Sequence, residues 1–464
     1  MALLHDDRLF PADPDTRTIA RRLYASVRHA PILSPHGHTQ ASWFANNQPF
    51  PDPAKLFIQP DHYVHRMLYS QGVRLQDLEI GVEQIRDPRR VWRLFADHYY
   101  LFRGTPTRLW LDYAFQELFG LTERLGSQTA DLYFDTIAAK LQTPEFRPRA
   151  LFDRFHIEVL ATTDSALASL ADHAAIRTSG WRGRVLPTFR PDAVVDPEFP
   201  GFATNLRTLG EITGQDTASW TGYLQALRTR RAFFKQNGAT ATDHGHPTAR
   251  TADLSPREIE DLFHRIFTKV FTTADAELFR AQMLTEMARM SLDDGLTMQL
   301  HPGSRRNHNL KLFQEFGPDM GADIPGSIEY VDALRPLLNR FGNEPGFTFI
   351  LFTLDESTYS RELAPLAGHY PCLRLGPPWW FQDSPEGMMR FRELTTETAG
   401  FYNTVGFNDD TRAFLSIPAR HDVARRVDSA FLARLVAEHR VEEDDAFEIL
   451  GDLTTNLARR AYKL

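Results

Sequence analysis

The chain is poor in the features that mark several common protein classes. Cys372 is its only cysteine among 464 residues, so no intrachain disulfide can form and a reducing compartment is expected. It has no run of 18 or more apolar residues, so we expect no membrane partner. The first residues, Met1 to Asp7, lack a basic segment followed by an apolar core. We therefore expect no secretory signal and a cytoplasmic location.

Positive charge and phosphate-binding motifs are also scarce. The formal net charge is −8 and no block rich in Lys and Arg occurs, so we expect no nucleic-acid partner. The absence of a Gly-rich phosphate loop, a Gly-x-Ser-x-Gly motif and a Cys-x-x-Cys motif argues against a kinase, a serine hydrolase and a thiol redox enzyme. With 42% hydrophobic and 24% charged residues, the chain has an ordinary globular composition.

Two histidines, His36 and His38, follow a short apolar run, 30–33, that is typical of a buried strand. Two imidazoles one residue apart beyond a strand end can face one point, and the small Gly37 lets the backbone bend between them. Neutral imidazole is the commonest protein ligand for a divalent metal. The chain has 17 His, so the alternative is that His36 and His38 form a chance pair in a surface loop. Further ligands elsewhere in the chain are needed to support a metal site.

Short apolar runs recur along the chain, each followed by polar residues and separated by helical patterns. Together with 30–33 there are eight of them: 157–161, 184–186, 239–242, 296–300, 347–354, 372–375 and 404–407. Eight strands alternating with helices predict an α/β fold whose parallel sheet closes into a barrel, one domain spanning 1–464. Residues from about 63 to 150 are helical in pattern and rich in aromatics, which predicts a helical insertion after the first strand.

The polar residues after the runs are the candidate ligands, because catalytic groups of such barrels follow the strands. A barrel brings its last strand beside its first, so Asp410 or Asp409 can reach His36 and His38. His301, midway round, could be a fourth ligand or could hydrogen-bond the substrate. Two His and one Asp suit one divalent ion, zinc or manganese, with positions open to substrate. Asp409-Asp410 could instead cap a helix.

Three arginines, Arg190, Arg306 and Arg412, each follow a predicted strand. A planar guanidinium binds a carboxylate or a diol through two hydrogen bonds, so three of them in one mouth would form an anion site in an acidic protein. Each could also form an ion pair between strands, and Arg305 is an alternative to Arg306.

Other motifs have both a functional and a structural interpretation. Tyr63, in Asp61-His62-Tyr63, could move a proton or merely pack. Trp379-Trp380 could wall a sugar pocket or be structural. His244 and His246, beside Asp243, form a second His-x-His motif and a rival metal site. We rank that site lower, because the run before it has few apolar residues.

Taken together and in this order, the motifs resemble those of the uronate isomerases (glucuronate isomerase), a family of the amidohydrolase superfamily. The resemblance covers nearly the whole chain and rests on eight segments: 34–38, 61–63, 161–164, 185–192, 299–303, 306–307, 379–381 and 410–416. It implies a distorted (β/α)8 TIM-like barrel of the metal-dependent hydrolase type and one divalent metal ion. The implied reactions interconvert D-glucuronate with D-fructuronate and D-galacturonate with D-tagaturonate.

The resemblance also implies roles for individual residues. His36, His38 and Asp410 would hold the metal, and Asp410 would help to take the C2 proton. Tyr63 would contact the C1 carbonyl and Arg412 the C2 and C3 hydroxyls, and together they would move a proton between these oxygens through an enediol. The remaining substrate-binding residues would be His62, Arg190, His301, Arg306 and Trp380.

An aldose–ketose isomerase of hexuronates is therefore the predicted function, with a small-molecule hexuronate as partner and a homo-oligomer as the expected assembly. The alternative is a metal-dependent hydrolase of the same superfamily, which would use the metal and Asp410 to activate water. Such hydrolases often carry a metal-bridging Lys or Glu after the fourth strand, where this chain has Asp243-His244. A non-catalytic sugar-acid binder is disfavoured, because exported binders of that kind carry a signal peptide.

Overall fold

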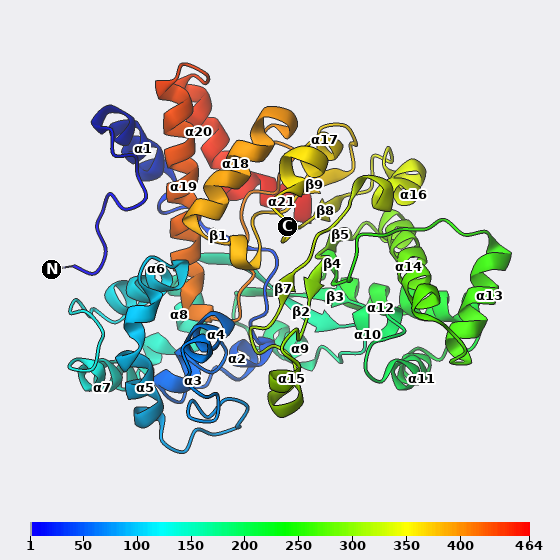
Figure 1. The fold of residues 1–464 in the computed structure, drawn as a ribbon, viewed down its shortest axis with the longest axis horizontal. Helices are drawn as coiled ribbons and strands as arrows, with labels where there is room; N and C mark the ends of the chain where they lie inside the picture. The colour runs from blue at the N-terminus through cyan, green and yellow to red at the C-terminus, as the bar shows by residue number, and fades with distance from the viewer. Residues whose placement is uncertain (1) are drawn as a thin grey trace.

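A curled, seven-stranded parallel sheet lies at the centre of this α/β protein (Figure 1). The computed structural model describes residues 2–464. The strands of the sheet, in spatial order, are β1 (Ile32–Ser34), β2 (Ile157–Ser165), β3 (Arg184–Arg190), β4 (Ala241–His244), β5 (Thr297–Leu300), β8 (Phe349–Leu351) and β9 (Leu373–Leu375). A separate antiparallel pair consists of β6 (Ser304–Arg305) and β7 (Ile324–Pro325).

Helices connect the strands and cover the sheet. Between β1 and β2 lie α2 (Ala41–Asn46), α3 (Pro53–Phe57), α4 (His62–Ser70), α5 (Pro88–Asp97), α6 (Pro106–Tyr113), α7 (Ala130–Leu141) and α8 (Pro148–Arg154). From β2 to β9 the helices are α9 (Ala171–Thr178), α10 (Asp192–Val195), α11 (Phe202–Thr213), α12 (Trp220–Gln236), α13 (Pro256–Phe267), α14 (Thr273–Asp294), α15 (Leu310–Phe316), α16 (Val331–Phe341) and α17 (Ala364–Ala367).

Helices from the N-terminal and C-terminal regions of the chain pack together on one side. There α1 (Pro14–Val27) contacts α19 (Ile417–Ala437), next to α18 (Pro385–Ala399) and α20 (Glu443–Gly451). The final helix is α21 (Leu457–Tyr462). Single 3₁₀ or π turns are η1 (Tyr99–Phe102), η2 (Ala114–Leu118), η3 (Pro144–Phe146), η4 (Tyr359–Leu363), η5 (Trp380–Gln382), η6 (Phe414–Ser416) and η7 (Asp452–Asn456).

The aromatic-rich helices between β1 and β2 form a lobe at the lower left of Figure 1. Their shared interior contains fully buried rings, among them Trp92, Phe95, Phe115 and Tyr133. The aromatic stripes of this region are thus core residues, since their rings pack on one another across several helices. Among residues 2–464, no helix combines the length and the apolar character needed to cross a membrane.

Seven of the eight predicted runs are strands of the sheet, whereas the eighth, 404–407, is not. It forms only an isolated parallel bridge between Leu375 and Thr404. Gly406, with φ +78°, interrupts the extended conformation that a longer pairing requires. The backbone N–H of His38 nevertheless donates to the carbonyl of Thr411 at 3.0 Å, which joins the segment after β1 to the one after this run. The arrangement is consistent with a distorted TIM-like barrel.

Alternation along the strands decides which side chains face the interior of the curled sheet. In β4, Ala241 packs in a cluster with Phe352 and Tyr462. Tyr462, from the last helix, fills the interior from one end and donates through its hydroxyl to Gln299 Oε1 at 2.9 Å. Asp243 has the same orientation as Ala241, whereas His244 points to the opposite face of β4. Because Tyr462 fills one end of the interior of the curled sheet, the polar side chains that follow the strands, such as Asp243, lie at the other end.

We expect Gly406→Ala to lower the free energy of unfolding by about 2–4 kcal/mol, because the added methyl group meets two penalties. The left-handed φ of Gly406 disfavours a Cβ, and that Cβ would lie 2.4 Å from the carbonyl oxygen of Leu453. Gly72→Ala is the matched control: its φ is +90°, but its Cβ would meet no atom within 4 Å. Denaturant unfolding followed by circular dichroism measures both, and an equal loss in the two variants would contradict the steric argument.

Candidate active site

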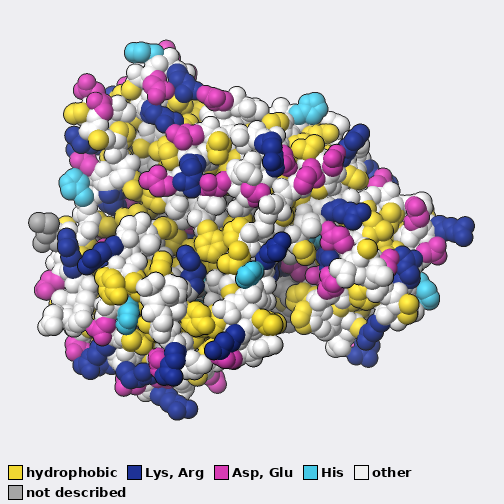
Figure 2. All heavy atoms as spheres, in the orientation of Figure 1, with side chains coloured by type: hydrophobic (Ala, Val, Ile, Leu, Met, Phe, Trp, Pro, Cys, Tyr) yellow, Lys and Arg dark blue, Asp and Glu magenta, His cyan; other side chains and the backbone are white. Residues whose placement is uncertain are grey.

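A cavity of about 1170 Å³ opens where the carboxyl ends of the strands converge. All of the residues predicted to bind metal or substrate line it: His36, His38, His62, Tyr63, Arg190, His301, Arg306, Trp380, Asp410 and Arg412. In the space-filling view, Lys or Arg and His side chains lie around a hollow near the middle of the face (Figure 2). The structure therefore brings residues from positions 36 to 412 into one site.

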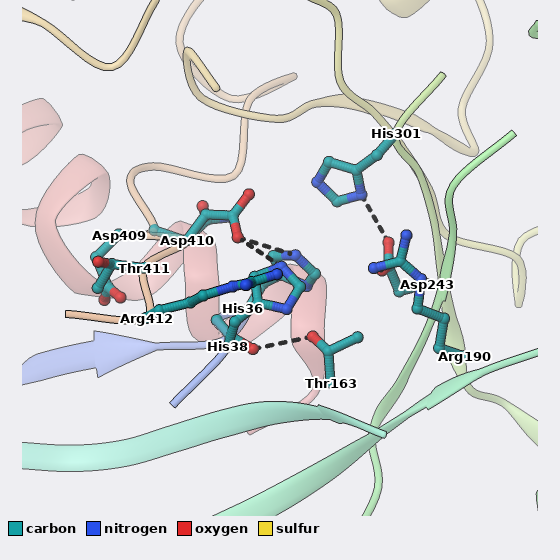
Figure 3. A network of polar contacts seen from close by, with 12 residues as sticks. His36, His38, Thr163, Arg190, Asp243, His301, Asp409, Asp410, Thr411 and Arg412 are labelled. Atoms are coloured by element: carbon teal, nitrogen blue, oxygen red, sulfur yellow. Dashed lines mark hydrogen bonds and ion pairs between the residues drawn. The ribbon is translucent and has the colours of Figure 1, made fainter. Parts of the chain in front are cut away.

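The histidine pair after β1 faces a carboxylate from the other end of the chain (Figure 3). Asp410 Oδ1 lies 3.4 Å from His36 Nε2 and 3.1 Å from His38 Nε2. The neighbouring Asp409 instead contacts His421 Nε2 at 3.1 Å and does not line the cavity. Of the two aspartates left open by the sequence, Asp410 is thus the one that reaches the pair. Its backbone φ of +36°, unusual for a non-glycine residue, gives this carboxylate its orientation.

His301 approaches the same point from β5. Its ring stacks on that of His36, with centroids 4.7 Å apart. Its Nδ1 contacts Asp243 Oδ1 at 2.6 Å, and Arg190 Nη1 lies 3.3 Å from the other oxygen of Asp243. Asp243 thereby orients the imidazole of His301, so that the second nitrogen of the ring is free for another partner.

The donors at this centre fit a divalent cation. One atom each from His36, His301 and Asp410 lies within 4.8 Å of the others. Nε2 of His301 is buried and has no hydrogen-bond partner among residues 2–464; buried Oδ1 of Asp410 accepts no hydrogen bond of good geometry there, although His36 and His38 lie 3.1–3.4 Å away. Buried polar atoms without a partner are unfavourable, and imidazole with carboxylate is a typical ligand set for zinc or a similar ion. His38 Nε2 lies 3.1 Å from the same carboxylate oxygen, but His38 is not among the donors that all lie within 4.8 Å of one another.

Charge coupling within the centre shifts its protonation equilibria. Burial alone would raise the pKa of Asp410, but contacts with His36 and His38 outweigh burial and hold it well below its ordinary value. Burial lowers the pKa of His36, yet the carboxylates of Asp410 and Asp243 outweigh that effect and raise it. Asp410 is therefore an ionised carboxylate that can hold a cation or accept a proton.

Tyr63 and His62 enter the cavity from the first turn of α4. The side chain of Asp61 caps this helix by accepting from the backbone N–H of Tyr63 at 2.8 Å. The hydroxyl of Tyr63 donates to the carbonyl of Trp380 at 2.7 Å, and the rings of His62 and Trp380 lie 5.5 Å apart. Burial raises the pKa of Tyr63 far above its ordinary value, so the phenol stays protonated and remains a hydrogen-bond donor.

Arg412 and Arg306 lie on the exposed side of the cavity. Arg412 Nη2 contacts Asp319 Oδ2 at 3.0 Å, and both side chains remain 38% exposed. This ion pair is accessible, so a substrate can replace Asp319 as the partner of Arg412. Arg306 lines the cavity and Arg305 does not, so Arg306 is the one of these two neighbouring arginines that can contact a ligand there.

Two charged groups of the site have roles that the sequence did not predict. In the sequence Asp243 was noted only beside His244 and His246, although its position directly after the predicted strand 239–242 already indicated a site residue. Arg420 lines the cavity, stacks on Trp110 with 3.6 Å between the guanidinium carbon and the ring centroid, and pairs with Asp383. Nothing in the local pattern of a long helix distinguishes such a buried cation, because its partners come from distant segments.

Fold and site together define an α/β enzyme with a buried histidine–carboxylate centre at the carboxyl ends of a curled parallel sheet. Comparison with known proteins gives the family. A sequence model described as glucuronate isomerase matches residues 11–462. The chain is 65% identical over 464 residues to a uronate isomerase of Phenylobacterium zucineum, which covers 99% of this chain and 97% of the relative.

Solved structures agree with the sequence comparison. The crystal structure of glucuronate isomerase from Caulobacter crescentus superposes with a TM-score of 0.98 at 62% identity, covering 100% of this chain and 98% of that one. The uronate isomerase of Thermotoga maritima has a TM-score of 0.92 at 26% identity, with 99% of both chains covered. The chain therefore belongs to the glucuronate isomerase family, and its activity is that of a uronate isomerase acting on a hexuronate. The family predicted from the motifs is confirmed.

Proposed function

We propose that the enzyme interconverts D-glucuronate with D-fructuronate and D-galacturonate with D-tagaturonate by moving a proton from C2 to C1 through an enediol. The observation that carries this proposal is the convergence in one cavity of an ionised carboxylate, a protonated phenol and an accessible guanidinium, from Asp410, Tyr63 and Arg412. An aldose–ketose shift needs these three functions: a base at C2, a donor at the carbonyl oxygen and stabilisation of the enediol.

In the forward direction Asp410 takes the C2 proton while Tyr63 donates to O1, which leaves a C1–C2 double bond with a hydroxyl on each carbon. Arg412 hydrogen-bonds the C2 and C3 oxygens and stabilises the charge that develops there. Tyr63, now a phenolate, then takes the proton of O2 while Asp410 returns a proton to C1, so the carbonyl group is at C2 and both side chains regain their starting protonation states. Before this, the Tyr63 hydroxyl must exchange the Trp380 carbonyl for the substrate.

The centre at His36, His38 and Asp410 would hold one divalent ion, zinc or manganese, with His301 as a further donor or as a substrate hydrogen bonder. When bound, such an ion supplies a Lewis acid that polarises and positions substrate oxygens. Arg190, Arg306, His62 and Trp380 complete the pocket, in which guanidinium groups favour a carboxylate-bearing sugar over a neutral one.

We further propose that the curled sheet is a distorted (β/α)8 barrel and that residues from about 63 to 150 are a helical insertion in a single domain. The hydrogen bond from His38 to Thr411 and the Leu375–Thr404 bridge support closure, and the unbroken series of helices between β1 and β2 supports the insertion. The cytoplasmic location and the homo-oligomer remain predictions from the sequence.

Incubation of the purified protein with D-glucuronate, and separately with D-galacturonate, in deuterium oxide tests the proposal. Nuclear magnetic resonance at C1 and C2 should show the matching ketose. Because a base exchanges its proton with solvent, some deuterium should appear at C1 of the product. Formation of no ketose from either sugar, with or without added zinc or manganese, would reject the isomerisation. A hydrolase would instead show no carbonyl shift at all.

A further inference from the structure

A second cluster of metal-type donors lies at the end of β4, outside the centre described above. His244 ends β4, His246 follows two residues later, and Asp192 begins α10 after β3. One donor atom from each of the three lies within 4.8 Å of the others. Because side chains alternate along a strand, His244 points to the face of β4 opposite Asp243, which belongs to the active site.

The two histidines of this cluster have unused nitrogens. Nδ1 of His244 and Nε2 of His246 are buried and have no hydrogen-bond partner among residues 2–464. The two residues are 0% and 5% exposed, so water does not readily satisfy these atoms. The other nitrogen of His244, Nε2, lies 3.1 Å from Thr242 Oγ1. A proton placed on Nε2 by that contact leaves the lone pair on Nδ1 for a ligand.

The carboxylate of Asp192 is held near the two histidines by the backbone N–H of Gly245 and by the side chain of Arg190. Gly245 N donates to Asp192 Oδ1 at 3.1 Å, and Arg190 Nε donates to the other oxygen, Oδ2, at 2.7 Å. A Cβ at residue 245 would lie 2.2 Å from Arg190 Nη2 and 2.9 Å from Asp192 Oδ2, so a larger residue there would displace the side chains of this arginine and aspartate. Oδ1 retains lone-pair capacity, and the three donors are positioned before any ligand arrives.

We propose that Asp192, His244 and His246 bind a second divalent cation. Two imidazoles and one carboxylate suit zinc or cobalt, whereas magnesium and calcium prefer sets made only of oxygen ligands. Metal–ligand bonds of about 2.0–2.2 Å place donors roughly 3.3–4.2 Å apart, so small side-chain rotations close the cluster around an ion. The ion pairs Asp192–Arg190 and Arg190–Asp243 connect this site to His301 in the active site.

Metal content measured on the full chain tests this site independently of turnover. The protein is stripped with a chelator, saturated with zinc, desalted and analysed by mass spectrometry of its metal content. We expect two zinc ions per wild-type chain, one in His36→Asn, one in His246→Asn and none in the double variant. His264→Asn, at an exposed position of α13, is the matched control and should keep two.

Three results would overturn the second site: one zinc per wild-type chain, two zinc ions retained in His246→Asn, or none bound by folded His36→Asn. The wild-type value needs no substitution, so it decides even if a variant fails to fold. Cobalt-loaded His36→Asn adds a spectroscopic reading, since visible absorption bands of nitrogen-ligated cobalt should appear there and disappear in the double variant. Their persistence in the double variant would also place the ion elsewhere.

Discussion

Asp410→Asn should abolish most of the turnover, and we expect kcat to fall at least about 1,000-fold. Asparagine keeps the size of the side chain but removes the negative charge and the ability to accept a proton from C2. It also leaves His36 and His38 facing a neutral amide 3.1–3.4 Å away, so the affinity of this centre for a cation should fall as well. Initial rates of ketose formation and the zinc content of the variant measure the two effects.

Asp409→Asn is the matched control, because the two aspartates are adjacent and both are largely buried. Asp409 contacts His421 and is absent from the cavity wall. We expect it to keep most of its turnover while the free energy of unfolding falls by about 1–3 kcal/mol, because a buried polar contact is weakened. If Asp409→Asn lost activity and Asp410→Asn kept it, the catalytic carboxylate would be wrongly assigned.

Arg412→Met should lower kcat about 100-fold or more, because the methionine keeps an extended side chain without hydrogen-bond donors or charge. In the free enzyme the guanidinium contacts Asp319 and is partly exposed, so its removal should disturb the fold little. A role at the C2 and C3 oxygens during the proton shift predicts that kcat falls more than KM rises. Steady-state kinetics with D-glucuronate separates the two parameters.

Arg305→Met serves as the control for Arg412→Met. Arg305 is exposed on β6 and does not line the cavity, so Arg305→Met removes one positive charge, as Arg412→Met does, without changing the cavity wall. Its replacement should leave kcat and KM near their wild-type values. An equal loss in both variants would mean that the net positive charge around the mouth, rather than the contacts of Arg412, controls the rate.

Local patterns were sufficient to predict most of the strands of the sheet and many, but not all, of the side chains that line the cavity. Seven apolar runs coincide with strands, because buried parallel strands require continuous apolar stretches that are visible in sequence. The run at 404–407 failed, since Gly406 combines a left-handed backbone with a close approach to Leu453, a residue in a different element. The conformation of Gly406 thus depends on Leu453, a neighbour about 50 positions away in the chain, which a local pattern does not include.

The low rank given to the His244 and His246 motif shows a second limit of predicting strands from composition. The run before them, 239–242, has few apolar residues and was the weaker of the predicted strands, yet 241–244 pairs with β5 over its whole length. Both polar residues of the strand are buried with partners: Thr242 Oγ1 contacts His244 within β4, and Asp243 contacts His301 after β5, and these contacts offset the cost of burial. Composition alone therefore undervalued a strand whose polar side chains find partners on both of its faces.

By itself, the sequence predicted the α/β class, the family and ten of the side chains that line the cavity, because apolar runs mark the strands and short motifs carry the family resemblance; it did not predict Arg420 or the role of Asp243. The strand pattern alone left Asp409 open beside Asp410 and Arg305 beside Arg306, and the family resemblance favoured Asp410 and Arg306; the tertiary structure shows how these two reach the cavity and that Asp243 orients His301. The physical reason is that these choices depend on backbone direction at single residues and on contacts between strands far apart in the chain.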